Sequence, residues 1–195
     1  MIACSCEVCT STSPKDKRLR SSILVETAKT RIIIDSGPDF RQQLLRGDVH
    51  DPGAAMFGGV AGHAGLFSSA YDLAVIMQML LNGGSFNGKK YLNEETVKLF
   101  TAYHSETSRR GYGFDKPEKD NATRPEPYPS LSASPLTFGH TGYTGTCTWA
   151  DPANQLIFIF LSNRVNPDGG DVNKKLLNMN VRPKIHEAIY KAIEK

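Results

Sequence analysis

Runs of apolar residues bounded by turn-forming residues predict strands near the N-terminus and in the last third of the chain. The runs 22–27 and 30–35 flank a two-residue connection and predict a β-hairpin. The stretch 137–149 begins as a strand, passes through three closely spaced glycines and returns to threonines alternating with larger residues. After turn residues at 151–155, the apolar run 156–161 predicts a buried strand. We expect these last two stretches to form a hairpin in the middle of a sheet.

Apolar residues at helical spacing predict a helix that begins after Ser69. Ser69 and Asp72 have the spacing of a capping box, and Gly83-Gly84 stops the helix. Apolar residues recur there at i, i+3, i+4, i+7 and i+8, which is typical of a helix face packed on a core. The residues expected on this face are Leu73, Ile76, Met77, Leu80 and Leu81.

Four further segments complete the predicted layout. Asn93 is expected to cap a second helix. The apolar contacts of that helix are expected from Val97, Leu99 and Phe100. A short strand is expected at 112–114 and a proline-rich surface loop at 117–135. The last helix is expected to start at Pro183, because proline is favoured in a first helical turn. Its inward-facing residues are expected to be Ile185, Ala188, Ile189, Ala192 and Ile193.

Composition describes an ordinary globular chain. Its 195 residues are 39% hydrophobic and 22% charged, which suits one domain, or one domain plus a fragment. No apolar run approaches the ~20 residues that cross a bilayer, and the first residues are too short and too polar downstream for a signal peptide. We therefore expect no membrane association and a cytoplasmic location, although serine hydrolase domains of the kind described below are often exported.

The formal net charge of +3 is unevenly distributed. Residues 1–46 carry eight Lys/Arg against five Asp/Glu, whereas residues 47–195 carry fifteen of each. The basic stretch 14–20 has no interleaved aromatic residues, so a solvated loop is favoured over a nucleic-acid contact and no nucleic-acid partner is expected. Three of the four cysteines, Cys4, Cys6 and Cys9, cluster at the N-terminus, and without a secretion signal they favour a metal site over disulfides.

The glycine-rich stretch holds the strongest candidate chemistry. His140, Thr141 and Gly142 put an imidazole, a hydroxyl and a bare backbone position in consecutive places. Gly142 and Gly145 would let another backbone or a ligand approach closely. A purely structural strand is the alternative interpretation.

His140-Thr141-Gly142, followed by Tyr143-Thr144-Gly145-Thr146, resembles the third motif of serine β-lactamases and penicillin-binding proteins, in which lysine is usual in the histidine place. The stretch 49–68, rich in glycine and alanine, is similar to the same family. The resemblance covers about 47–195. It implies an α+β fold, with an antiparallel sheet flanked by helices, and a reaction that transfers an acyl group through a seryl ester.

The resemblance also implies roles for individual residues. Thr141 would contact the acyl or carboxylate group of a small-molecule acyl substrate, and His140 would take the place of the lysine. A backbone N–H near Tyr143 would help to form an oxyanion hole. No cofactor is implied for this chemistry. The substrate would be a β-lactam, a peptide or a small ester.

Two motifs that this chemistry needs are missing. No serine lies three residues before a lysine, so the nucleophile and base that share one helix turn are absent; Thr12 and Lys15 have the spacing by coincidence. Tyr91-Leu92-Asn93 has the letters of the second motif but follows the glycine-rich region instead of preceding it. We therefore expect this chain to be catalytically incomplete, with residues 140–143 as a substrate-binding remnant or as relics on a structural strand.

The N-terminal segment resembles a different family. Cys4, Cys6 and Cys9, and then Ile34-Asp35-Ser36-Gly37-Pro38-Asp39-Phe40-Arg41, are similar to the metallo-β-lactamase superfamily, nearest to its phosphodiesterases of phosphonate metabolism. The resemblance implies that 1–46 supplies two strands and a helix capped by Asp39, and that the cysteines are structural zinc ligands without their fourth partner. No His-x-His occurs, so a catalytic metal site is not expected. The boundary at 46/47 is interpreted as a fusion or an assembly error that divides the chain into 1–46 and 47–195.

Two non-enzymatic interpretations remain beside the incomplete hydrolase. One is a binding module that holds a peptidoglycan-like ligand without turnover, and the other is a zinc-dependent scaffold. Self-association is also left open, because a sheet without its full set of covering helices would expose apolar surface.

We expect zinc, if it binds, to bind weakly and at low occupancy. Three thiolates from Cys4, Cys6 and Cys9 leave one of four tetrahedral positions to water, buffer or Cys147. Metal analysis after dialysis against a mild chelator should find less than one zinc per chain. A stoichiometric ion that survives this treatment would require a fourth protein ligand.

Overall fold

The computed structural model describes residues 22–26, 31–34, 68–165 and 174–193. The N-terminal cysteine triplet and the helix expected at 39–46 lie outside these residues, as does the glycine-rich region before Ser68.

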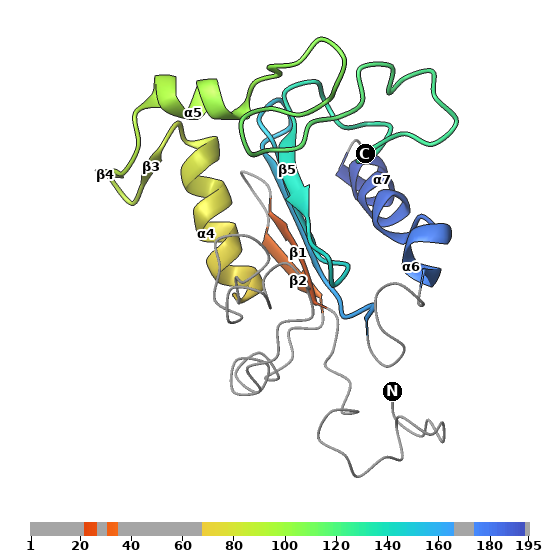
Figure 1. Ribbon diagram of the computed structural model, residues 1–195. Coiled ribbons are helices and arrows are strands. Elements are labelled where there is room, and N and C mark those ends of the chain that lie inside the picture. The colour runs from red at the N-terminus through yellow and green to blue at the C-terminus, as the bar shows by residue number, and fades with distance from the viewer. Residues whose placement is uncertain (1–21, 27–30, 35–67, 166–173, 194–195) are drawn as a thin grey trace, which may run out of the picture.

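The described residues form one five-stranded antiparallel sheet in the order β2-β1-β7-β6-β5 (Figure 1). Its strands are β1 (Ser22–Glu26), β2 (Arg31–Ile34), β5 (Phe138–Thr141), β6 (Cys147–Asp151) and β7 (Leu156–Leu161). The predicted N-terminal hairpin is confirmed, since β1 pairs with β2. The predicted buried strand is confirmed as β7, the middle strand, which pairs with β6 on one side and β1 on the other.

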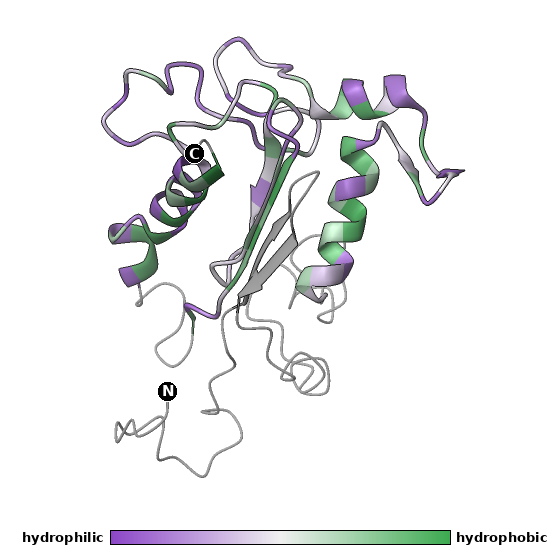
Figure 2. Cartoon of the chain, turned by 180° about the vertical axis from the view of Figure 1, so that it is seen from behind, coloured by the Kyte–Doolittle hydropathy of each residue, from purple (hydrophilic) through white to green (hydrophobic). Residues whose placement is uncertain are grey.

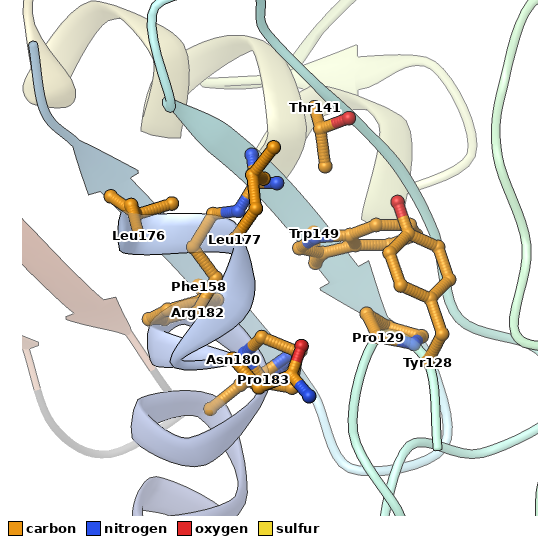
Figure 3. Close-up of a pocket in the computed structure, with 11 residues that line it drawn as sticks. Tyr128, Pro129, Thr141, Trp149, Phe158, Leu176, Leu177, Asn180, Arg182 and Pro183 are labelled. Atoms are coloured by element: carbon orange, nitrogen blue, oxygen red, sulfur yellow. The ribbon is translucent and has the colours of Figure 1, made fainter. Parts of the chain in front are cut away.

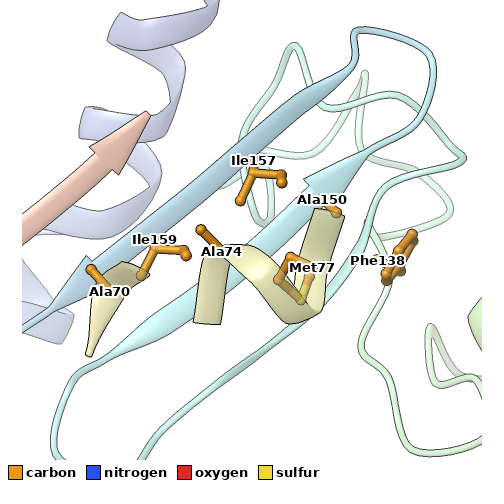
Figure 4. Close-up of a cluster of buried hydrophobic side chains, with 7 residues drawn as sticks. All are labelled: Ala70, Ala74, Met77, Phe138, Ala150, Ile157 and Ile159. Carbon is orange, nitrogen blue, oxygen red and sulfur yellow. The ribbon is translucent and has the colours of Figure 1, made fainter. Parts of the chain in front are cut away.

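The two-residue period of the strands gives the sheet two apolar faces. One face packs on α4 (Ala70–Leu81), which Figure 2 shows as a largely hydrophobic helix. The sheet residues of this face are Phe138, Ala150, Ile157 and Ile159, which meet Ala70, Ala74 and Met77 in Figure 4. The opposite face is covered by α6 (Lys175–Asn178) and α7 (Val181–Ile193) (Figure 1). Its sheet residues are Cys147, Trp149, Phe158 and Phe160.

The start of α4 is as predicted, but its core-facing stripe differs. The Ser69 hydroxyl accepts the Asp72 N–H at 3.1 Å and donates to the Asp72 carboxylate at 2.7 Å. The buried residues are Ala70, Ala74 and Met77, while Ile76, expected in the core, is 48% exposed. Two alanines on one side let the helix backbone approach the sheet, so this side turns inward. Of the predicted stripe, only Met77 is fully buried; its half-buried flanks are Leu73, Leu80 and Leu81.

The second helix and its surroundings also depart from expectation. After the small ribbon of β3 (Ser85–Phe86) and β4 (Lys89–Lys90), α5 (Glu94–Thr101) begins at Asn93, whose side chain makes no capping hydrogen bond. Val97 alone is buried on this helix; Leu99 and Phe100 are exposed, because α5 is not covered by the sheet. The strand expected at 112–114 is absent, and a single bridge between Asp115 and Gly139 stands beside β5 instead.

The last helix is confirmed with a corrected start and face. α7 begins at Val181, so Pro183 lies inside its first turn. The fully buried residues are His186 and Tyr190, with Ile185 and Ile189 half-buried beside them. Ala188, Ala192 and Ile193, which were expected to face inward, are exposed. The long side chains of His186 and Tyr190 reach the sheet, and the His186 ring stacks on Phe158 at 4.3 Å.

Carboxylates tie the predicted loop at 117–135 to the rest of the fold. The Asp151 carboxylate accepts the N–H and hydroxyl of Ser134 at 3.1 and 2.5 Å and the Tyr190 hydroxyl at 2.7 Å. It also accepts the Ala153 N–H at 3.0 Å within the β6–β7 turn. Glu187 of α7 accepts two hydroxyls and one N–H from Ser130 and Ser132. No helix among the described residues has the length and apolar character needed to cross a membrane.

We expect Asp151→Asn to lower the free energy of unfolding by about 2–3 kcal/mol, because an amide cannot accept all of these donors and leaves buried groups unpaired. Urea denaturation would measure the change. Glu126→Gln, which removes a carboxylate from an exposed loop position, is the matched control and should change stability by less than about 0.5 kcal/mol.

The same carboxylate predicts acid sensitivity. Burial would raise the pKa of Asp151, but hydrogen bonds from Ser134, Asn154 and Tyr190 outweigh burial and lower it below 3.8. Because the folded pKa lies below the unfolded one, the stabilisation is complete above about pH 4 and is lost as the pH falls further. Asp151→Asn should therefore flatten the pH dependence of stability below pH 4, and an unchanged slope would contradict this assignment.

Candidate functional site

The glycine-rich stretch forms two strands joined by a tight turn. The Gly142 N–H donates to the Thr146 carbonyl at 2.8 Å, and the Gly145 N–H donates to the Gly142 carbonyl at 3.0 Å. A Cβ on Gly142 would lie 2.2 Å from the Thr146 hydroxyl, and Gly145 has a φ of +97°, a left-handed value that favours glycine. The close approach is present, but the approaching groups are side chains of this chain, Thr146 at Gly142 and Ser162 at Gly145, and not the second backbone or the ligand that was expected.

The register of β5 places His140 and Thr141 on opposite faces of the sheet. His140 lies opposite Thr148 and shares its face with Phe138, which packs on α4. Thr141 lies opposite Cys147, which packs on the α7 side. The sequence places the imidazole and the hydroxyl next to each other, but the strand turns them apart.

Both ring nitrogens of His140 are engaged. Nδ1 lies 2.7 Å from the Thr141 carbonyl oxygen, and Nε2 lies 2.8 Å from a guanidinium nitrogen of Arg110. A carbonyl only accepts and a guanidinium only donates, so Nδ1 carries the proton and Nε2 accepts from Arg110. In this geometry the imidazole is neutral, and Arg110 brings the positive charge to the edge of β5.

Arg110 belongs to an ion network around a buried carboxylate. Asp115 is 1% exposed, and its carboxylate lies 2.9 Å from Nε of Arg110 and 3.4 Å from Nε of Arg109. Tyr128 donates its hydroxyl to the same carboxylate at 3.1 Å. The pKa of Tyr128 is raised well above its ordinary value, mainly by burial and next by the charge of Asp115. The phenol therefore stays protonated and can donate a hydrogen bond. The Arg109 guanidinium also lies 4.4 Å from the centroid of the Tyr128 ring.

Sequence reasoning missed this network. Arg110 and His140 are 30 positions apart, and neither Arg109 nor Asp115 lies in a recognisable motif. The network is positioned next to β5 by a bridge in which Asp115 and Gly139 exchange both backbone hydrogen bonds, at 2.7 and 3.0 Å. A bridge between single residues leaves no periodic pattern in a sequence.

On the α7 side, Thr141 lines a pocket of 210 Å³ (Figure 3). Tyr128, Pro129 and Trp149 form one wall beside Thr141, and residues of α6 and α7 form the other. Tyr143, the last member of the predicted remnant, lies in the turn with the Arg164 guanidinium 5.0 Å from its ring centroid. Of the four predicted residues, Thr141 is therefore the one that opens into this pocket.

The described residues offer neither a metal site nor a reactive thiol. Among residues 22–26, 31–34, 68–165 and 174–193 there is no group of three His, Cys, Asp or Glu side chains that could hold a metal ion. Cys147 is buried, and burial raises the pKa of its thiol to about 12. Tyr91 is exposed, with Lys89 beside its ring, and Asn93 is used at the start of α5. The zinc site expected at Cys4, Cys6 and Cys9 lies outside the described residues.

Comparison with known proteins supplies a family context for this geometry. The family model described as Beta-lactamase matches residues 10–180. Over 138 residues the chain is 44% identical to the "Putative D-alanyl-D-alanine carboxypeptidase" of Escherichia coli (strain K12), a match that covers 70% of this chain and 31% of the relative. A protein of the same name from Salmonella enteritidis PT4 (strain P125109) is 43% identical over 128 residues, which cover 65% of this chain and 29% of that protein.

The extent of these matches can be compared with the boundary expected at 46/47. The chain spans about a third of the length of these curated relatives. The family match begins before the boundary expected at 46/47 and ends well after it. The resemblance of residues 1–46 to the metallo-β-lactamase superfamily stays a prediction.

We expect the His140 ring to carry its proton on Nδ1. Nitrogen NMR of chain labelled at histidine would distinguish the two tautomers. Arg110→Met removes the donor at Nε2 and should increase the share of the Nε2–H form, whereas Arg124→Met, which removes an arginine from another ion pair of the same loop region, should leave the His140 signals unchanged. An Nε2–H ring in the unmodified chain would contradict the arrangement.

Proposed function

The chain belongs to the β-lactamase family of serine β-lactamases and penicillin-binding proteins, and from that premise we propose that it carries the substrate-binding strand of an acyl-transfer site. The proposed reaction is hydrolysis of a peptide of the D-alanyl-D-alanine type through a seryl ester. Ser-x-x-Lys is not among the motifs of this chain, so the proposed reaction needs a serine and a base that these 195 residues do not supply. The chain by itself is the incomplete half of the site.

The observation that carries this proposal is the outer edge of β5. In the part of the chain that the structure describes, β5 is the last strand of the sheet and pairs with β6 on one side only. Gly139 gives both of its backbone groups to Asp115 on the outer side. Because ladder hydrogen bonds alternate along an antiparallel strand, Thr141, two residues further on, directs its N–H to the same side. An extended peptide can add to such an edge through its main chain.

The groups around this edge suit an acyl substrate that carries a negative charge. The Arg110 guanidinium lies on the α4 side of this edge with a half-exposed side chain, and Thr141 supplies a hydroxyl on the α7 side. His140 has no free ring nitrogen, so it is suited to hold Arg110 in place and not to move protons. Proton transfer would then be carried out by a segment that bears Ser-x-x-Lys and Tyr-x-Asn, which this chain lacks.

A binding module without turnover is the second candidate. The engaged state of His140 and the absence of Ser-x-x-Lys favour it for this chain alone. A D-alanyl-D-alanine peptide that raises the melting temperature without being hydrolysed would support this candidate. The zinc-dependent scaffold and the separate origin of residues 1–46 depend on the zinc measurement described above.

Complementation tests the proposed function. We would insert a related domain's segment bearing Ser-x-x-Lys and Tyr-x-Asn at the 46/47 boundary, which keeps β1 paired with β7. The unmodified chain should show no turnover of a p-nitrophenyl ester, because loss of the nucleophile–base unit removes on the order of 10⁶ in kcat. The complemented chain should hydrolyse the ester, and hydrolysis should depend on the new serine.

Substitutions on β5 then test the role of its residues. Thr141→Val removes the hydroxyl but keeps the branched shape and should lower kcat/KM roughly 10- to 100-fold, as expected for loss of a hydrogen bond to a charged group. His140→Ala should cost less, since the supplied lysine and tyrosine carry the proton transfer. Thr148→Val, the same change on the neighbouring strand, is the matched control. Equal activity of the Thr141 and Thr148 variants would mean that the hairpin is scaffold only.

A further inference from the structure

The pocket on the α7 side of the sheet has features that the acyl-transfer proposal does not use. It lies between the sheet and the helix pair α6–α7, and Tyr128 and Pro129 close it from the loop (Figure 3). Thr141 is the one predicted site residue that it shares. Its volume of 210 Å³ is below the ~300–1,000 Å³ of pockets for drug-sized ligands, so it fits one ring with a short substituent.

Three aromatic side chains form part of the apolar surface of the pocket, beside two leucines and two prolines. Trp149 and Phe158 are buried on the sheet, and the Tyr128 ring stands edge-on to Trp149, with ring centroids 5.4 Å apart and planes at 85°. Aromatic rings favour edge-to-face and offset contacts with another ring. A planar ring is therefore the shape that these walls accommodate best.

The charge of the pocket is one-sided. Among the described residues that line it, Arg182 is the only charged one, and none is an aspartate or glutamate. One guanidinium nitrogen of Arg182 donates to the Thr146 carbonyl at 3.0 Å, and no carboxylate of the described residues forms a salt bridge with it. An anionic group is the complement of this cation, and a carboxylate matches the planar fork of a guanidinium.

A buried histidine supplies a second, independent indication of a ligand. His186 lines the pocket, is 1% exposed, and its Nδ1 has no hydrogen-bond partner. Buried polar groups are nearly always hydrogen-bonded, so an unpaired buried nitrogen indicates a hydrogen-bond partner that the described residues do not provide. Burial lowers the pKa of His186 to about 3, so the ring is neutral and leaves the charge of the pocket to Arg182.

We propose that this pocket binds a small aromatic carboxylate, with the carboxylate on Arg182 and the ring packed against the wall formed by Tyr128, Trp149 and Phe158. A carboxylate oxygen would also accept a hydrogen bond from an Nδ1–H of His186, which would give that nitrogen the partner it lacks. Binding of this kind needs no seryl nucleophile. The proposal is therefore independent of the acyl-transfer function, although a ligand in the pocket would contact Thr141.

Isothermal titration of the full 195-residue chain with phenylacetate tests the proposal. Phenylacetate should bind, while benzyl alcohol, which keeps the ring without the charge, and acetate, which keeps the charge without the ring, should each bind at least tenfold more weakly. Equal affinity for phenylacetate and benzyl alcohol would overturn the assigned role of Arg182, and equal affinity for acetate would overturn the role of the aromatic walls.

Variants on α7 locate the binding. Arg182→Gln should weaken phenylacetate at least tenfold, and Arg182→Lys, which keeps the charge, should weaken it less. Lys184→Gln removes an exposed cation two residues away that does not line the pocket, and it should leave binding unchanged. Circular dichroism melting checks that each variant is folded. Unchanged binding to Arg182→Gln, or an equal loss in Lys184→Gln, would overturn the proposal.

The two proposals can fail separately. Hydrolysis by the complemented chain requires the inserted serine and Thr141, whereas phenylacetate binding by the unmodified chain requires Arg182. If the complemented chain hydrolyses the ester but the unmodified chain does not bind phenylacetate, only the proposal of a ligand in the pocket is refuted.

Discussion

The buried carboxylate of Asp151 holds together three parts of the chain: the β6–β7 turn, the long loop and α7. It ends β6, caps the turn into β7, and accepts hydrogen bonds from Ser134 in the long loop and from Tyr190 on α7. A buried charge is tolerated only where several donors surround it, so these segments must meet at one point. The loop that carries Tyr128 toward Thr141 is fixed through this junction, and so is the helix that carries Arg182 and His186. The shape of the candidate site and of the pocket beside it both depend on Asp151.

Strand register has an equally strong effect on the chemistry. A one-residue step along β5 moves a side chain to the other face of the sheet. His140 therefore meets Arg110 on the α4 side, and Thr141 meets Tyr128 and the pocket on the α7 side. The two side chains therefore lie on opposite faces of the sheet, and only the edge of β5 gives access to both. In the function that we propose, His140 stands in the place of the lysine with both nitrogens engaged, and Arg110 from another segment would supply the cation.

Sequence patterns predicted the parts of this fold that local rules determine. The capping box at Ser69, the buried strand β7 and the N-terminal hairpin follow from residues close together in the chain, and all three are confirmed. Helix faces were predicted less well. Ile76 and Ile193 are apolar but exposed, while His186 is polar but buried, because the packing partner decides which side of a helix turns inward. The Asp115 network and the pocket join distant segments, and no periodicity could have indicated them.

The N-terminal hairpin has a defined place in the sheet, because β1 pairs with β7. β1 pairs with β7 at five positions, from Ser22 opposite Leu161 to Glu26 opposite Ile157. β7 is a continuous apolar strand, and without β1 it would present an unpaired edge of backbone donors and acceptors. Long apolar edges of this kind recruit strands from other molecules. The hairpin therefore covers the edge of β7, while β5, at the other end of the sheet, pairs with no further strand among the described residues; this is the edge at which we propose that a substrate adds.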